Sequence, residues 1–180
     1  MKKYQIIYAD PPWRYKDATP NRKVENHYPT MSLSEIKAVE IPSEKKSVLF
    51  LWATTGKLPE CLEVMKAWGF EYKSSLIWDK MKFGMGYWFR GQHEFLLVGT
   101  KGQFSPPPQP LRIRSVYQEP RKKHSKKPDR IRQYINEWYP DCSKLELFAR
   151  QKTEGWDVWG NEVESDIDLL SSLDKSPNSS

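Results

Sequence analysis

The chain has 180 residues, of which 38% are hydrophobic and 13% aromatic, and its formal net charge is +6. A chain of this length and hydrophobicity can bury a substantial core, which excludes an intrinsically disordered protein and favours a single domain. No apolar stretch approaches the roughly 20 residues that cross a bilayer, and the first residues enter a predicted strand at once, so we expect a cytoplasmic protein with no signal peptide and no membrane partner.

The first predicted element is a buried strand over residues 4–9, and the motif Asp10-Pro11-Pro12-Trp13 follows it directly. Neither proline has an N–H, and each favours extended geometry in the residue before it, so the strand must end here. Asp10 and the carbonyl groups beside it are therefore held stiffly at the carboxyl end of a strand. In open α/β sheets this is where ligands bind.

This motif suits the methylation of an exocyclic amine on a nucleobase. Such an amine is a poor nucleophile, because its lone pair is delocalised into the ring. Two fixed acceptors at Asp10 and Pro11 can take its N–H bonds and aim the lone pair at a methyl donor, while Trp13 stacks on a base that has left its helix. The alternative is a simple strand-terminating turn, and the four residues alone do not decide between the two.

The middle of the chain alternates between helix and strand patterns. A short helix is expected over 32–39, capped by Ser32 with Glu35 three residues later. Strands follow over 47–53, 74–79 and 94–99, and a helix over 57–68 separates the first two. Residues 80–90 hold Lys80, Lys82, Trp88 and Arg90 with glycines between them, which predicts a loop able to lie against nucleic acid.

Residues 112–132 form a basic stretch, with nine Lys and Arg against one Glu and one Asp. Such a stretch is typical of phosphate-backbone binding, although a solvated charged loop has the same composition. A helix is expected over 127–139, with Pro128 at its first position and Pro140 beyond its end. A strand over 144–149 and a weaker one near 156–159 complete the pattern.

Strands that alternate with helices predict a Rossmann-like, doubly wound α/β fold with a mostly parallel sheet. Residues 1–162 form the predicted domain, and residues 163–180, which are acidic and rich in serine, are expected to be a flexible tail. Cys61 and Cys142 are expected to be reduced thiols. The scattered histidines have no metal-ligand spacing, so we predict no metal.

Over residues 4–162 the sequence resembles the adenine-N6 methyltransferases that carry an Asp-Pro-Pro-Trp motif. The blocks that carry the resemblance are residues 7–13, 27–32 with 35–36, 49–52, 91–102, 127–129, 145–150, 155–156 and 159–162. One block alone would be weak, but all of them occur in the family's order and at compatible spacing. The resemblance implies a permuted S-adenosylmethionine-dependent methyltransferase, in which the catalytic strand comes early and the cofactor strand late.

The resemblance also implies the site residues. Catalysis is expected at Asp10, Pro11, Pro12 and Trp13. The methyl donor S-adenosylmethionine, which becomes S-adenosylhomocysteine, is expected to contact Asp10, Lys127, Glu146, Phe148, Arg150, Asn161 and Glu162. Glu162 stands where the eukaryotic enzyme has glutamine, which limits its side chain to accepting hydrogen bonds.

Substrate contacts are expected at Tyr28, Glu94, Arg121, Lys122, Lys123 and Lys126. From the residues alone three alternatives stay open. Lys127 also fits a phosphate contact, Tyr28 a turn anchor, and Glu94 an exposed carboxylate at the start of a strand.

The expected function is the transfer of a methyl group to adenine N6 in DNA, in the cytoplasm of a bacterial or phage-infected cell. DNA is favoured because the chain has the size of bacterial and phage relatives. An RNA adenine methyltransferase, a cytosine-N4 methyltransferase and a non-catalytic nucleic-acid-binding subunit remain alternatives. A homodimer would be consistent with a domain this small, which offers little surface both to hold a flipped base and to read its flanks.

Overall fold

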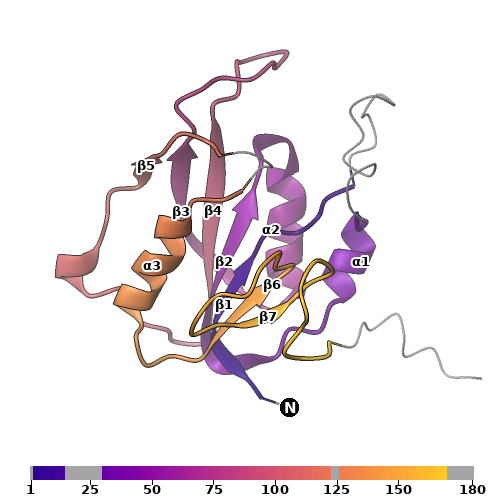
Figure 1. The fold of residues 1–180 in the computed structure, drawn as a ribbon, viewed down its shortest axis with the longest axis vertical. Coiled ribbons are helices and arrows are strands. Elements are labelled where there is room, and N and C mark those ends of the chain that lie inside the picture. Colours follow the sequence, from indigo (N-terminus) through magenta and orange to yellow (C-terminus); the bar gives the residue numbers. More distant parts are fainter. Residues whose placement is uncertain (1, 15–29, 123–125, 170–180) are drawn as a thin grey trace, which may run out of the picture.

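The computed structural model describes residues 2–14, 30–122 and 126–169, and these form a seven-stranded sheet with helices on both faces (Figure 1). The strand order across the sheet is β5-β3-β4-β2-β1-β6-β7. The strands are β1 (Tyr4–Ala9), β2 (Ser43–Ala53), β3 (Glu71–Asp79), β4 (His93–Lys101), β5 (Val116–Gln118), β6 (Lys144–Leu147) and β7 (Asp157–Trp159).

Strand directions place one set of ends at a common edge. β1 pairs in parallel with β2 and β6, β6 with β7, and β3 with β5, whereas β4 is antiparallel to both β2 and β3. Among the described strands β4 alone therefore runs against the others. The amino end of β4 lies at the same edge as the carboxyl ends of β1, β2, β3 and β6, and we call this edge the carboxyl edge.

Two helices cover one face of the sheet and one covers the other. The helices are α1 (Leu33–Ala38), α2 (Leu58–Ala67) and α3 (Asp129–Trp138), with short 3-10 turns at Thr55–Lys57 and Gln109–Leu111. Ile36 of α1 and Cys61, Val64 and Met65 of α2 pack in one core. Ile131 and Ile135 of α3 pack in a second core. The fold is therefore doubly wound, as the alternation of elements predicts.

From Ile6 to Ala9 the residues of β1 alternate between these two cores, whereas Tyr4, before an irregularity in the pairing with β2, lies in the core of α1 and α2. Ile7 and Ala9 face the core of α1 and α2, whereas Ile6 and Tyr8 face the core of α3. The order in which strands are added to the sheet also reverses at β1. From β1 the chain continues to β2 on one side, and the late strand β6 is added on the other side. The carboxyl edge beside β1 is thus a topological switch point, the usual ligand site of such sheets.

The predicted strands and helices are all present, and their boundaries differ for physical reasons. β6 ends at Leu147, earlier than the predicted residue 149, because Phe148 adopts a left-handed backbone conformation with φ of 59°. β5 carries no strand signal of its own, being three residues long with two exposed side chains. α1 has the predicted capping box, in which Ser32 Oγ accepts from Glu35 N and Glu35 accepts from Ser32 N.

The segment after β7 packs on the domain over residues 163–169, which belong to the predicted tail. Asp166 N donates to Val158 O at 2.9 Å, and Asp166 Oδ2 accepts from Val158 N at 2.9 Å. Ile167 and Leu169 pack against the core of α1 and α2. Of the predicted substrate contacts, Tyr28 and Lys123 lie outside the described residues. None of the described helices is long and apolar enough to cross a membrane.

Candidate active site at the carboxyl edge

The Asp10–Trp13 segment is fixed by backbone hydrogen bonds immediately after β1. Pro11 O accepts from Trp13 N at 3.0 Å, and Pro12 O accepts from Met31 N at 2.8 Å. Trp13 is only 6% exposed and packs in the core of α1 and α2, with Lys57 Nζ 5.9 Å from its ring centre. The ring of Trp13 therefore presents little surface to a ligand in this structure. Stacking of Trp13 on a base stays a prediction.

Asp10 is the first member of a row of alternating charges. Asp10 Oδ2 lies 3.2 Å from Lys127 Nζ, and the same ammonium lies 3.0 Å from Glu94 Oε2. The other oxygen of Glu94 lies 3.3 Å from Lys80 Nζ. We call Asp10, Lys127, Glu94 and Lys80 the charge row. It joins the end of β1, the residues before α3 and the facing ends of β3 and β4.

The charge row is buried at its centre. The side chains of Lys127 and Glu94 are 11% and 10% exposed, whereas that of Asp10 is 32% exposed and accessible to a ligand. Burial alone would lower the pKa of Lys127, but Asp10 and Glu94 outweigh it and raise that pKa to about 12. Lys127 therefore remains a cation at any physiological pH. Its contribution to stability is lost only as the pH rises through that value.

A second buried ion pair lies under the same edge. Arg132 of α3 donates to Glu146 Oε1 of β6 at 2.7 Å and to Asp129 Oδ1 at 2.6 Å. Its guanidinium also lies 5.7 Å from the ring centre of Tyr8, whose hydroxyl accepts from Trp52 Nε1 at 2.6 Å. Burial raises the pKa of Glu146, while Arg132 acts to lower it. Glu146 Oε2 and the hydroxyl of Thr153 are both buried, and Thr153 also acts to lower the pKa of Glu146.

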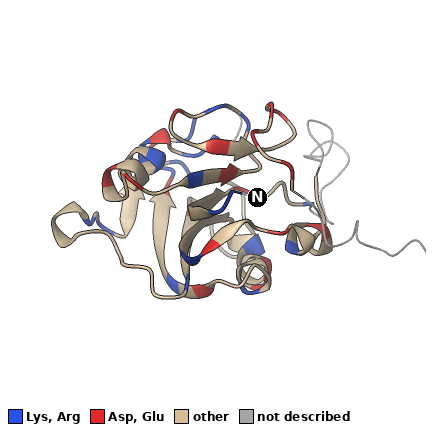
Figure 2. Cartoon of the chain, turned by 90° about the horizontal axis from the view of Figure 1, so that it is seen from below, with Lys and Arg blue, Asp and Glu red and all other residues tan. Residues whose placement is uncertain are grey.

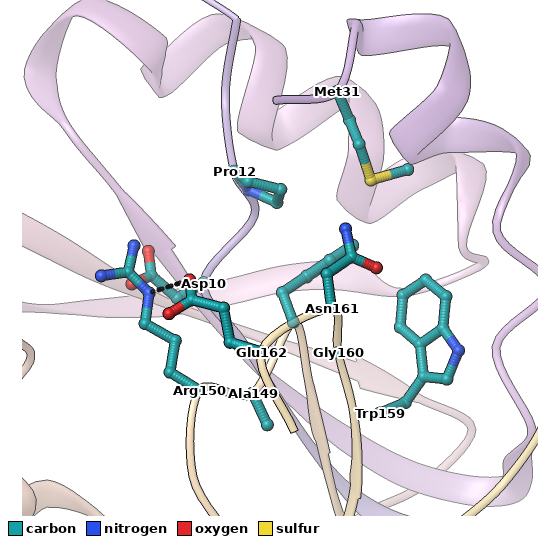
Figure 3. A pocket seen from close by; sticks show the side chains of 10 residues that line it. Asp10, Pro12, Met31, Ala149, Arg150, Trp159, Gly160, Asn161 and Glu162 are labelled. Carbon is teal, nitrogen blue, oxygen red and sulfur yellow. Dashed lines mark ion pairs between the residues drawn. The ribbon is translucent and has the colours of Figure 1, made fainter. Parts of the chain in front are cut away.

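A pocket opens between the ends of β1, β6 and β7 (Figure 3). It is lined by Asp10, Pro12, Met31, Phe148, Ala149, Arg150, Trp159, Gly160, Asn161 and Glu162. Figure 3 shows the ion pair of Arg150 with Glu162, at 3.6 Å, next to Asp10, with Met31 and Trp159 at the other side of the pocket. A second hollow of ≈ 360 Å³ shares Asp10, Phe148, Arg150 and Glu162 and extends to Tyr8, Lys127 and Glu146.

Backbone geometry after β6 and β7 shapes this pocket. Phe148 has a positive φ, which is uncommon for a bulky residue and costs conformational energy. Its ring contacts Trp159, with ring centres 5.4 Å apart. A Cβ atom on Gly160 would lie 2.2 Å from Ala149 O, so the chain can approach this closely only with glycine there. The two loops therefore meet as one wall.

The lining suits a ligand with an apolar plane, hydroxyl groups and charge. Rings at Phe148 and Trp159 and the thioether of Met31 can contact a flat group. Arg150, Glu162 and Asn161 offer donors and acceptors for hydroxyl groups. Glu146 lines the joined hollow, where its carboxylate offers a further acceptor to a donor group on the ligand. S-adenosylmethionine has a flat adenine, ribose hydroxyl groups and charged groups, so the residues that line the pocket fit this ligand.

The structure brings most of the predicted site residues together. Asp10, Pro12, Phe148, Arg150, Asn161 and Glu162 line one pocket, and Lys127 and Glu146 line the hollow joined to it. Glu94 is buried and paired with Lys127, which excludes the alternative of an exposed carboxylate. Lys127 faces two carboxylates, so in this structure its charge is already matched. The roles assigned to all these residues stay predictions.

The predicted basic contacts lie less close to the site. Arg121 and Lys122 are exposed, and Lys122 lies 3.6 Å from Glu119 and 3.8 Å from Asp129. Lys126 lines the hollow and pairs with Asp129 at 2.8 Å. Arg132 belongs to the same basic stretch of the sequence but is buried against Glu146. Arg132 therefore pairs with Glu146 inside the domain and is not exposed to contact a phosphate.

Sequence reasoning missed Tyr8, Met31, Arg132, Trp159 and Gly160 as site residues. A signal for Arg132 was available, because it lies next to Ile131 and three residues before Ile135, on or near the buried face of the predicted helix. A charge there needs a buried partner, and Glu146 in an apolar strand is the natural one. Gly160 and Met31 lie in the blocks 159–162 and 27–32 of the resemblance, but their place in the pocket depends on loop geometry. No group of three or more metal-ligating side chains occurs among the described residues.

Removing Arg132 should destabilise the domain strongly. Arg132→Met leaves Glu146 buried without its cation, which typically costs roughly 3–5 kcal/mol of unfolding free energy. The double variant Arg132→Met with Glu146→Gln removes both charges and should recover a large part of that loss. Urea unfolding followed by circular dichroism measures all three proteins.

The control for this pair is Arg130→Met, which breaks the exposed ion pair of Arg130 with Glu137 on the same helix. Exposed pairs contribute little, so this variant should stay close to the parent protein. Equal losses for Arg130→Met and Arg132→Met, or no recovery in the double variant, would contradict the assigned burial of the pair.

Comparison with known proteins agrees with the geometry of the site. Residues 4–162 match the MT-A70 family. The Type II methyltransferase M.MunI from Mycoplasma sp is 36% identical over 183 residues, which cover 90% of this chain and 78% of that protein. The human N(6)-adenosine-methyltransferase catalytic subunit METTL3 is 30% identical, with 94% of this chain and 30% of that protein covered.

The Drosophila melanogaster N(6)-adenosine-methyltransferase MT-A70-like protein is also 30% identical, and the chain spans only 30% of its length. The matched range 4–162 contains the charge row, both ion pairs and the whole pocket lining. The chain therefore belongs to the MT-A70 family of methyltransferases, whose members use S-adenosylmethionine.

Proposed function

We propose that this protein transfers the methyl group of S-adenosylmethionine to the N6 amine of adenine in DNA. The observation that carries the proposal is the position of Asp10. Its carboxylate ends the central strand β1, is held by Lys127, remains accessible, and borders the pocket that fits the donor. A carboxylate fixed between a donor pocket and an exposed edge can hold an exocyclic amine in line with a methyl group.

When bound, S-adenosylmethionine supplies an electrophilic methyl group. The residues that would hold it are Phe148 and Trp159 for its adenine, Arg150 with Glu162 for its ribose hydroxyls, and Glu146 for a donor group deeper in the hollow. Pro12 and Met31 close the pocket on the side of the Asp10–Trp13 segment.

Asp10 acts on the target amine. Its carboxylate accepts a hydrogen bond from an N–H of the amine, which favours a more pyramidal nitrogen and directs the lone pair toward the donor. Pro11 O already accepts from Trp13 N, but a carbonyl oxygen has a second lone pair, with which it can accept the other N–H. Lys127 restricts Asp10 to one orientation, so little reorganisation is needed when the amine arrives.

DNA is the substrate we propose over RNA. M.MunI, the Type II methyltransferase, is matched over most of its own length. The eukaryotic N(6)-adenosine-methyltransferases are matched over 30% of theirs, so whatever the rest of those proteins contributes has no counterpart in the match. A non-catalytic binding subunit is the less favoured function, because the Asp-Pro-Pro-Trp residues are intact and Asp10 borders a donor pocket.

The direct test is nucleoside mass spectrometry after incubation of the protein with S-adenosylmethionine and either mixed-sequence DNA or RNA. We expect N6-methyladenine in the DNA digest. Methylation of RNA alone would contradict DNA as the substrate and would leave the proposed methyl transfer to adenine N6 unchanged. The absence of methylated bases from both digests, in a protein that binds S-adenosylmethionine, would overturn the enzymatic function.

Asp10→Asn should abolish most of the turnover and leave the fold intact. The amide keeps the shape but loses the negative charge that attracts the N–H of the amine and that pairs with Lys127, and loss of such a preorganised group costs roughly 10²–10³-fold in rate. Single-turnover methylation of DNA measures the effect, and circular dichroism checks the fold. The exposed Asp141, between α3 and β6, provides the control Asp141→Asn, which should retain the parent rate. Asp10→Asn at near-parent rate would disprove the role of Asp10.

Arg121→Gln with Lys122→Gln should weaken DNA binding and reduce its salt dependence. If both side chains contact phosphates, the slope of log affinity against log salt becomes shallower by about 1.8. Fluorescence anisotropy with a labelled duplex at several salt concentrations measures the slope. Lys45→Gln with Lys46→Gln, two exposed lysines in the amino-terminal half of β2, is the matched control. The same slope in both double variants would make Arg121 and Lys122 part of a solvated surface.

A further inference from the structure

The connection between β3 and β4, residues 80–92, exposes more large apolar side chains than any other described segment. It extends beyond the end of the sheet (Figure 1). Trp88 and Phe89 are 91% and 85% exposed, and Tyr87 is fully exposed. Met81, Phe83 and Met85 are also more than half exposed. A soluble domain rarely leaves this much apolar surface in one segment without a binding function.

The shape of this segment is held by specific contacts. Lys80 N donates to Gln92 O at 2.9 Å, and Gly84 N donates to Gly91 O at 2.8 Å. Asp79 Oδ1 accepts from Met81 N and from Gln92 Nε2, each at 2.8 Å. A Cβ atom on Gly86 would lie 2.1 Å from Phe89 O, so the tip requires glycine at that position. The hairpin therefore presents residues 87–89 on a closed turn.

The base of the hairpin is joined to the active site through the charge row. Lys80, the first residue of the connection, pairs with Glu94, which pairs with Lys127, which pairs with Asp10. The hairpin leaves β3 and enters β4 at the carboxyl edge, where Asp10 lies. Any molecule that brings an amine to Asp10 therefore approaches the same edge from which the aromatic tip extends.

The chemistry of the hairpin fits nucleic acid. Residues 80–92 contain Lys80, Lys82 and Arg90 and no acidic residue. Aromatic rings with cations between them can stack on bases while the cations contact phosphates. In the rest of the described chain, basic residues lie among acidic ones, as the view from below shows (Figure 2). A segment with cations and no carboxylate favours a polyanion over a second protein chain as its partner.

We propose that the tip formed by Tyr87, Trp88 and Phe89 is a wedge that stacks on bases beside the target adenine and holds that adenine out of the duplex. This rests on the proposed function. A base inside a duplex cannot reach Asp10, and extruding it costs stacking and pairing energy. Aromatic side chains inserted at a base step replace part of the lost stacking, as apolar wedges do in other proteins that distort DNA.

The test uses the duplex sequence that the parent protein methylates, with 2-aminopurine in place of the target adenine. This base fluoresces weakly when stacked and strongly when extruded. We expect the parent protein to raise the fluorescence, and Trp88→Ala with Phe89→Ala to suppress most of that rise. Tyr72→Ala, at an exposed aromatic near the amino end of β3, is the matched control and should behave as the parent protein does.

Turnover on two substrates separates a wedge from a general binding defect. On the paired duplex the double variant should lose roughly tenfold to hundredfold in kcat/KM, the equivalent of stacking on one base. On a duplex with a mismatch opposite the target adenine, extrusion is easier, and most of this loss should disappear. An equal loss on both duplexes, or no loss on either, would overturn the proposal.

Sedimentation of the parent protein and the double variant tests the competing explanation that the tip binds a second copy of this chain. A change from dimer to monomer in the variant, with unchanged 2-aminopurine fluorescence per bound duplex, would assign the tip to a second copy of this chain and overturn the wedge. The proposed function fails separately, because it requires only that the parent protein methylate DNA. A parent protein that methylates DNA and a double variant that matches it would refute the wedge alone.

Discussion

The position of the Lys127 ammonium between Asp10 and Glu94 is the constraint on which the rest of the site depends. The three side chains come from β1, from the residues before α3, and from β4, so a single cation fixes the relative positions of three parts of the chain. Two carboxylates left without this cation would repel each other at the base of the site. The same ammonium that stabilises the edge therefore also orients the acceptor that we assign to the target amine.

The pocket that we propose for the donor depends on a second set of buried charges and on backbone geometry. Arg132 and Glu146 join α3 to β6 beneath the hollow, and Tyr8 packs against the guanidinium. Above them the left-handed Phe148 and the close approach of Gly160 to Ala149 form one wall. Strained backbone of this kind persists only where the surrounding structure holds it, and it is often found at functional sites. The two ion-pair systems thus flank a pocket that Asp10 borders, and this is the pocket we propose for the donor.

The sequence was enough to predict the fold class, the helices and six of the strands, because hydrophobic periodicity, prolines and the Ser32 cap are local signals. β5 was missed because three residues at the end of the sheet carry no local pattern. In the site, Asp10 was predicted from its motif. The family resemblance implied the late residues Glu146, Phe148, Arg150, Asn161 and Glu162, which line the pocket or the hollow joined to it. The pairing of Lys127 with both carboxylates depends on which elements meet in space, and no local pattern encodes that. The burial of Arg132 had a local signal, its place next to Ile131 and three residues before Ile135 on the predicted helix, and was still missed.

The most direct test of this account compares two adjacent lysines. Lys127→Met removes the cation between Asp10 and Glu94, whereas Lys126→Met removes a neighbour that pairs with Asp129 at 2.8 Å. Single-turnover methyl transfer is measured at saturating DNA and S-adenosylmethionine. The account predicts that Lys127→Met loses roughly 10²-fold or more in rate, while Lys126→Met keeps its rate and changes only its affinity for DNA. Equal rates in the two variants would contradict it.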